Sequence, residues 1–268
     1  MKSGLQAICP QQTPCKCCGA PALPYGVVDF HKNCEICHRK VLDISGVPIY
    51  YHRCPICQFL FTIAFDHFTK EDFLRHVYND EYLLVDPEYQ EARPRRHAAF
   101  LCGLFSGGWP RRILDYGGGQ GLLAELLRAA GFSQAETYDP LVVRHAAKPP
   151  GRFDCVVCFE VVEHSTDPAR IFAEMSEFLT DPGLILFSTL LQPANLDQVG
   201  LNWWYAGPRN GHVSLYSRAS LEKIVHPLGF QLGSFNDALH VLIREMPDFA
   251  RHFIRGSHHP AGSAPPAA

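Results

Sequence analysis

The sequence predicts an α/β fold in which a doubly wound, mostly parallel sheet follows a small β module of the zinc-ribbon type. Three observations support this prediction. Eight of the eleven cysteines lie within the first 57 residues. From residue 111 onward, short apolar strands alternate with amphipathic helices, which is the pattern of a parallel sheet. A glycine-rich loop follows the first of these strands.

Length and composition set the broad limits. The chain has 268 residues, of which 47% are hydrophobic, enough for one average domain and a smaller one. The formal net charge of −3 disfavours nucleic acid and anionic membrane surfaces as partners. No apolar run is long enough to span a membrane, and the first residues lack the apolar stretch of a secretory signal. We therefore expect a cytoplasmic protein with reduced thiols.

The N-terminal cysteines form three C-x-x-C pairs. These are Cys15 with Cys18, Cys34 with Cys37, and Cys54 with Cys57. A C-x-x-C turn directs two thiolates at one ion, and two such turns complete a tetrahedral zinc site. The runs CKCCG and CPIC most resemble paired zinc knuckles. We therefore predict a structural zinc ion held by Cys15, Cys18, Cys54 and Cys57.

The remaining cysteines leave alternatives open. Cys34 and Cys37 lie in the intervening loop, or hold a second ion with Cys17 and either Cys9 or His38; a redox dithiol or spare thiols is the other interpretation. In the domain that follows, Cys155 and Cys158 belong to the apolar run FDCVVCFEVV. Side chains alternate along a strand, so these two thiols face opposite sides and are expected in the core.

The chain divides by composition into four parts. Residues 1–66 form the cysteine-rich module, and residues 67–100 form a helical linker that covers the following domain as a lid. Residues 101–250 form the main domain. The last part, residues 251–268, is rich in proline, alanine and glycine and is predicted to be disordered.

The main domain is predicted to alternate strands and helices in a fixed order. The strands are RRILDY, AETYDP, FDCVVCFEVV, GLILFSTLL and one strand within GSFNDALHVLIRE. The helices between them are LLAELLRAAGF, ARIFAEMSEFLT and SLEKIVHPLGF. Asp167 and Pro168 suit the cap and first turn of the second helix.

The glycine loop has the spacing G-x-G-x-G at Gly117, Gly119 and Gly121. The dinucleotide fingerprint requires G-x-G-x-x-G, and Leu122 stands where its third glycine would fall. Asp115 lies two residues before the first glycine. Asp139 ends the next strand, where an acid accepts hydrogen bonds from ribose hydroxyls.

Together these features resemble motif I of class I S-adenosylmethionine (SAM)-dependent methyltransferases, which have a Rossmann-like fold. The run from Cys158 to His164, CFEVVEH, resembles their motif IV, E-V-x-E-H. The resemblance implies an adenine contact at Phe153–Asp154. The residues that it implies for SAM binding are Asp115, Gly117, Gly119, Gly121, Asp139, Asp154, Phe159 and Glu160.

Glu160, Glu163 and His164 are the candidate catalytic group. Their i, i+3, i+4 spacing places them on one face of a helical turn, where they hold a divalent ion or act directly as a base. In ubiquinone-pathway O-methyltransferases, which this segment resembles, the matching residues bind a metal, whereas many relatives with this motif use none. We predict His164 as base or orienting group; otherwise Glu163 and His164 cap the helix and shape the pocket.

The run from Asn202 to Ser217 contains two tryptophans and a G-H-x-x-x-Y-S segment. Similar stretches occur in this methyltransferase group at the substrate side. There the aromatic side chains wall a small pocket and His212 contacts the acceptor. In the other interpretation, Trp203 and Trp204 pack in the core and Ser217 caps a helix that starts near Ser220.

The layout of a cysteine-rich module, an aromatic-rich linker and a SAM domain resembles zinc-containing sugar C-methyltransferases. The chain is shorter and lacks their G-x-H-G-E-Y segment. We expect a methyltransferase that acts on a small molecule, preferably at oxygen, such as a sugar or secondary metabolite, and that is a monomer or homodimer. The alternatives are an enzyme that recognises a macromolecule through the zinc module, and a non-catalytic SAM-binding scaffold. The glycine spacing disfavours an NAD oxidoreductase.

Overall fold

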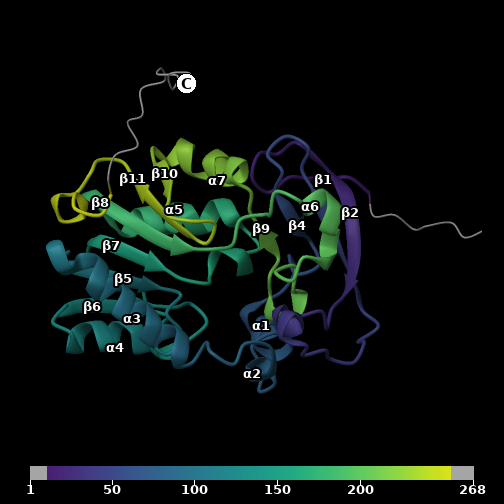
Figure 1. Cartoon of the computed structure of the whole chain (residues 1–268), viewed down its shortest axis with the longest axis horizontal. Helices are drawn as coiled ribbons and strands as arrows, with labels where there is room; N and C mark the ends of the chain where they lie inside the picture. Colours follow the sequence, from purple (N-terminus) through teal and green to yellow (C-terminus); the bar gives the residue numbers. More distant parts are fainter. Residues whose placement is uncertain (1–10, 255–268) are drawn as a thin grey trace, which may run out of the picture.

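The structure, a computed structural model, describes residues 11–254 and contains two sheets (Figure 1). The larger sheet has six strands in the order β10-β11-β8-β7-β5-β6. The bounds of its strands are β5 Arg112–Tyr116, β6 Gln134–Tyr138, β7 Phe153–Cys158, β8 Leu179–Ser188, β10 Gln231–Ser234 and β11 Leu239–Ile243. Strands β6, β5, β7 and β8 are parallel, and β11 pairs antiparallel with β8. The prediction of a mostly parallel sheet is confirmed.

Helices cover both faces of this sheet, as Figure 1 shows. One face carries α3 Ala92–Leu104 and α4 Leu122–Ala129, and the other carries α5 Pro168–Phe178 and α7 Arg218–Val225. Asp167 caps α5, since its side chain accepts a hydrogen bond from Arg170 N, and Ser217 caps α7 in the same way. These two capping predictions are confirmed.

The alternation of strand side chains divides the core into two layers. On β7, Cys155 and Val157 pack on the side of α3 and α4, whereas Val156 and Cys158 pack on the side of α5 and α7. All four are fully buried. Cys155 and Cys158 are therefore core thiols on opposite faces, as predicted.

The smaller sheet joins two distant parts of the chain. Its strands are β1 Thr13–Pro14, β2 Pro21–Asp29, β3 Pro48–Arg53, β4 Leu60–Thr62 and β9 Ser214–Leu215, in that order across the sheet. Strand β9 comes from the segment after β8, and it pairs with β4 through Leu60–Leu215 and Phe61–Ser214. The cysteine-rich module and the later segment thus form one continuous sheet, which the sequence did not reveal.

Short helices connect the two sheets. They are α1 Lys70–His76 and α2 Tyr82–Val85 in the linker, and α6 Leu196–Val199 in the segment before β9. The 3₁₀ turns are η1 Cys34–His38, η2 Phe105–Gly107, η3 Val143–His145, η4 Val162–His164, η5 Gly200–Asn202, η6 Pro208–Asn210, η7 His226–Leu228 and η8 Asp248–Ala250. Within the described residues, no helix is long and apolar enough to cross a membrane.

The C-terminal part departs from prediction in two places. The single strand expected within GSFNDALHVLIRE is a hairpin of β10 and β11, because residues 235–238 form a turn in which Asn236 Oδ1 accepts hydrogen bonds from Ala238 N and Leu239 N. Residues 251–254, predicted to be disordered, are packed: the Phe253 ring lies 5.7 Å from the Phe105 ring, and His252 Nε2 lies 2.8 Å from Leu104 O. Apolar contact with α3 and η2 outweighs the local composition. Residues 255–268 lie outside the described part of the chain.

The predicted boundary at residue 100 falls inside α3, which runs on to Leu104 and packs against α4. The division into four parts, including residues 1–66, therefore stays a prediction.

Candidate active site

The glycine loop connects β5 to α4 at the carboxyl edge of the large sheet. Gly117 has φ +73°, and a Cβ there would lie 2.5 Å from Val161 Cγ2, so no other residue fits. Gly121 has φ +84° at the N-cap of α4. The backbone of this loop therefore lies directly against the loop that follows β7.

Asp139 fixes the glycine loop through a hydrogen bond to its backbone. Its Oδ2 accepts a hydrogen bond from Gly119 N at 2.9 Å, and its Oδ1 accepts one from Leu141 N at 2.8 Å. A carboxylate has about four acceptor positions, so each oxygen can accept a further hydrogen bond. The structure thus brings together Asp115, Asp139 and the three glycines as the sequence predicts.

Three buried polar atoms beside the glycine loop have no hydrogen-bond partner: Asp115 Oδ2, Thr137 Oγ1 and His145 Nε2. A Cβ on Gly121 would lie 2.8 Å from His145 Nε2 and 3.3 Å from Thr137 Oγ1. Buried polar atoms without partners are rare, and at a glycine loop they suit a polar ligand or ordered water. Thr137 and His145 were missed in the sequence because neither belongs to a recognised motif.

Two of the implied cofactor residues lie elsewhere. Asp154 is at the amino end of β7, the edge opposite the glycine loop, and its Oδ2 accepts a hydrogen bond from Arg112 N at 2.8 Å. A contact between Asp154 and a ligand at the carboxyl edge is therefore excluded, and so is one at the adjacent Phe153, which is fully buried. Phe159 is at the correct edge, and its ring lies 4.3 Å from that of His97 on α3.

The acid and imidazole groups after β7 form a buried cluster. Its residues differ from the predicted group of Glu160, Glu163 and His164. Ligand atoms of Glu163, His164 and His212 all lie within 4.8 Å of one another. The Tyr205 hydroxyl donates to Glu163 Oε1 at 2.8 Å. Glu160 lies outside this group and accepts a hydrogen bond from Ser188 Oγ at 2.6 Å.

Local backbone geometry explains this difference. The segment Val162–His164 is a single 3₁₀ turn rather than an α-helix, and Glu160 precedes it with φ +55°. The i, i+3, i+4 face expected for Glu160, Glu163 and His164 is therefore absent. His212 takes the third place, because Val213 N donates to Glu163 O and holds its segment alongside.

Burial controls the ionisation of the cluster. Burial, and then the charge of the nearby Glu160, raises the pKa of Glu163 to about 8. Burial lowers the pKa of His212 to about 4 and that of His164 well below its ordinary value. At neutral pH both imidazoles are uncharged, and His164 Nδ1 is buried without a hydrogen-bond partner.

Two further side chains reach this cluster from the N-terminal half. Cys34 Sγ lies 3.5 Å from His212 Nδ1. The Tyr78 ring lies 6.0 Å from that of His164, and burial together with the charges of Asp139 and Glu163 raises the Tyr78 pKa. Tyr78 therefore lies near both the glycine loop and the cluster. The sequence placed it in the linker as a helical apolar position only.

The four predicted metal-binding cysteines lie together. Cys15 Sγ is 3.5 Å from Cys57 Sγ, and Cys18 Sγ is 3.5 Å from Cys54 Sγ; all four sulfurs lie within 4.8 Å of one another. Four thiolates around zinc, each at about 2.3 Å, stand about 3.8 Å apart. The four-cysteine cluster therefore fits a tetrahedral metal ion.

The two turns that carry these sulfurs have the same backbone geometry. Gly19 N donates to Cys15 O, and Gln58 N donates to Cys54 O, each at 2.9 Å. Gly19 and Gln58 both have left-handed backbones, with φ +73° and +61°. Among the described residues, Cys17, Cys34 and Cys37 belong to no such cluster; Cys9 lies outside the described part.

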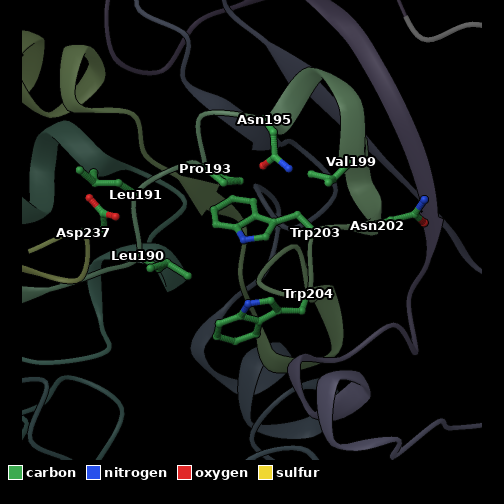
Figure 2. A pocket seen from close by; sticks show the side chains of 9 residues that line it. All are labelled: Leu190, Leu191, Pro193, Asn195, Val199, Asn202, Trp203, Trp204 and Asp237. Carbon is green, nitrogen blue, oxygen red and sulfur yellow. The ribbon is translucent and has the colours of Figure 1, made fainter.

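The segment that follows β8 borders a groove of about 600 Å³ (Figure 2). Trp203 and Trp204, which the sequence predicts to wall a substrate pocket, both line this groove. Trp203 is also 93% buried and belongs to an apolar cluster, so the packing interpretation holds for it as well.

A doubly wound sheet with a glycine loop and a partner acid at its carboxyl edge, and with the antiparallel strand β11 beside β8, fits the class I methyltransferase fold. Residues 88–234 match the methyltransferase domain family, which is more than half of the chain. The chain belongs to this family.

Individual relatives agree with this assignment. The ubiquinone biosynthesis O-methyltransferase of Thiobacillus denitrificans is 30% identical over 103 residues, covering 30% of this chain and 44% of its own length. That of Escherichia coli is 30% identical over 114 residues, covering 34% and 48%. The chain thus spans less than half of these relatives. An O-methyltransferase family protein from Burkholderia thailandensis shares the fold, with a TM-score of 0.51 and 13% identity over 66% of this chain and 63% of its own.

The ionisation of Asp115 yields a prediction for the ligand-free protein. Burial, and then the charge of Asp139, raises the Asp115 pKa to about 7, above its unfolded value. The free energy of unfolding of the wild type therefore falls as pH rises from about 4 to 7, and it stays at the lower value above pH 7. The total loss is at most about 4 kcal/mol. Asp115→Asn should remove this loss, so its advantage in thermal unfolding temperature should be larger at pH 8 than at pH 5. An equal difference at both pH values would contradict the assignment.

Proposed function

We propose that the chain is a SAM-dependent methyltransferase that methylates an oxygen atom of a small-molecule acceptor. One observation carries the proposal. The glycine loop and the acid–imidazole cluster adjoin at one sheet edge, where Gly117 lies against Val161 and Glu163 follows two residues later. A methyl donor and an acceptor must meet in line at such a point.

The cofactor side is formed by this chain's loop and two acids. The backbone of Gly117, Gly119 and Gly121 would approach the ligand, and both Asp139 oxygens would accept from its ribose hydroxyls. The buried polar atoms of Asp115, Thr137 and His145 would face the bound cofactor as further hydrogen-bonding groups. When bound, SAM supplies a methyl group activated by its sulfonium charge.

The acceptor side needs a group that takes a proton. His164 is uncharged at neutral pH, so its imidazole can accept the hydroxyl proton as the new C–O bond forms and the C–S bond breaks. Glu163 and Tyr205 hold the adjacent hydrogen bond at 2.8 Å and would orient the acceptor. His212 lies beside His164, with ring centroids 4.9 Å apart.

A divalent ion at this cluster is the second candidate arrangement. Glu163, His164 and His212 present one carboxylate and two imidazoles within 4.8 Å, a donor set suited to a transition metal. With a metal bound, these residues would act as its ligands and not as bases. Glu160, which we expected among the ligands, is excluded from this set by its hydrogen bond to Ser188 and its place outside the group.

We further propose that the four-cysteine cluster holds a structural zinc ion. Four thiolates leave no open coordination position for a reactant. The cluster adds to an apolar core, because Cys15, Cys54 and Cys57 are buried together with Phe59 and Phe61.

The cofactor assignment predicts a clear difference among three variants. Gly117→Ala adds a Cβ against Val161, and Asp139→Asn removes a charged acceptor. Each should weaken SAM binding in titration calorimetry about 10- to 100-fold or more. Asp154→Asn, at the opposite edge, is the matched control and should bind as the wild type does. Wild-type affinity in both test variants would sink the proposal.

The metal assignment predicts zinc content. Protein purified without chelator should hold about one tightly bound zinc per chain. Cys54→Ser should lose it, since Cys54 Sγ faces Cys18 Sγ at 3.5 Å. Cys37→Ser should retain it, because Cys37 is exposed and outside the cluster. Elemental analysis of the wild type and the two variants measures the zinc content. Loss of zinc in Cys37→Ser alone would show that the proposed set of four ligands is wrong.

Catalysis by His164 predicts a loss of turnover without loss of cofactor. His164→Asn should reduce the formation of S-adenosylhomocysteine from a screened acceptor by roughly 10²–10⁴-fold. SAM affinity should stay within about threefold, because His164 lies on the acceptor side. His38→Asn, on the surface of η1, is the control. Undiminished turnover in His164→Asn would remove the residue from the mechanism.

A further inference from the structure

The groove beside the tryptophans is built by three segments that converge after β8. Leu190, Leu191 and Pro193 come from the loop directly after this strand, and Asp237 comes from the turn between β10 and β11. The third wall runs from α6 through η5 and consists of Asn195, Val199, Asn202, Trp203 and Trp204. Figure 2 shows both indole rings on the same side of the groove, across from Leu190 and Asp237.

Tyr205 connects this groove to the acid–imidazole cluster. Its hydroxyl accepts a hydrogen bond from Leu190 N at 3.3 Å, on the groove wall, and donates to Glu163 Oε1 at 2.8 Å. Its ring lies 5.4 Å from each indole ring. Tyr205 therefore contacts both the groove wall and the acid–imidazole cluster, so the groove and the proposed site of methyl transfer lie on two sides of one side chain.

The wall formed by α6 and η5 is held by Tyr25 on β2 and by Lys32 just after that strand. Lys32 Nζ donates to Trp203 O at 2.9 Å and to Ala206 O at 2.6 Å. The Tyr25 hydroxyl donates to Leu196 O at 3.0 Å. A site whose backbone is held before the ligand arrives loses less entropy on binding. These contacts therefore favour a formed binding site over a gap between loops.

The lining selects for a flat ring without negative charge. Indole faces attract planar rings and cations. Trp204 is 40% exposed and presents such a face. Asp237 is the charged residue among the nine described lining residues, and none of the nine is basic. A carboxylate repels an anionic group and attracts a cation or a hydrogen-bond donor.

We propose that this groove is the acceptor subsite and that it binds a planar ring compound that is uncharged or cationic, with its ring on Trp204 and its donor or positive group at Asp237. The inference rests on the proposed methyltransferase function and specifies its substrate class. A volume of about 600 Å³ lies within the roughly 300–1,000 Å³ of small-molecule sites. Phosphorylated acceptors are disfavoured, since their charge would face Asp237.

Three probes with one ring system and different charges test the inference: 2-naphthol, 2-naphthylmethylammonium and 2-naphthoate. Each is titrated calorimetrically into the full chain with saturating SAM. We expect the ammonium probe to bind at least as tightly as naphthol, and naphthoate to bind about tenfold more weakly or not at all. Trp204→Ala should weaken naphthol and ammonium binding about tenfold, which is the usual scale for loss of one stacking partner.

Asp237→Asn should bring the ammonium and naphthol affinities together. Asp197→Asn is the matched control, since Asp197 is a nearby carboxylate that does not line this groove. It should leave the order of the probes unchanged. Tightest binding of naphthoate, or an unchanged affinity in Trp204→Ala, would overturn the inference.

The cofactor titration separates this result from the proposed function. If SAM binds and no probe binds, the groove assignment fails while the methyltransferase proposal stands. If SAM does not bind, the methyltransferase proposal fails, and titration of the probes without SAM then decides the charge preference of the groove by the same criteria.

Discussion

The pairing of β4 with β9 is the contact that joins the N-terminal sheet to the segment between β8 and α7. Only two residue pairs form it, Leu60–Leu215 and Phe61–Ser214. It nevertheless continues the N-terminal sheet into the segment that carries Trp203 and His212. Ser217 Oγ donates to Cys57 O at 2.7 Å next to it, which ties the cap of α7 to a predicted metal ligand. The cysteine cluster therefore contacts the same segments that hold the groove and the acid–imidazole cluster in place.

Burying an acid and two imidazoles costs desolvation free energy, and the structure shows what offsets this cost. Glu163 is fully buried, and desolvation keeps its pKa high, so it carries a proton at neutral pH instead of an isolated charge. The Tyr205 hydroxyl satisfies one of its oxygens, while Glu163 Oε2 has no partner. An arrangement left incomplete in this way is characteristic of sites that bind something, because a purely structural core would satisfy both oxygens.

The sequence was informative where chemistry is local and uninformative where contacts are distant. Gly117 and Asp139 could be predicted because the turn and the strand end that they need are built by neighbouring residues. The paired C-x-x-C turns were recognisable for the same reason, although Gln58 takes a left-handed conformation usually filled by glycine. Glu160 was grouped with Glu163 because a helix was assumed where the chain forms a 3₁₀ turn. Nothing in the spacing places His212 beside His164 or Cys34 beside His212, since only the tertiary fold brings these residues together.

The difference between local and distant contacts also limits what relatives can tell about the acceptor. The family match covers residues 88–234, which include the glycine loop and Asp139 but not the cysteine-rich module. Two hydrogen bonds from Lys32 and one from Tyr25, both in that module, hold the walls of the groove. A relative that lacks these two residues can share the cofactor site and still form a different groove. The proposed acceptor class therefore rests on the groove's own residues, above all Asp237 and Trp204, and not on the relatives.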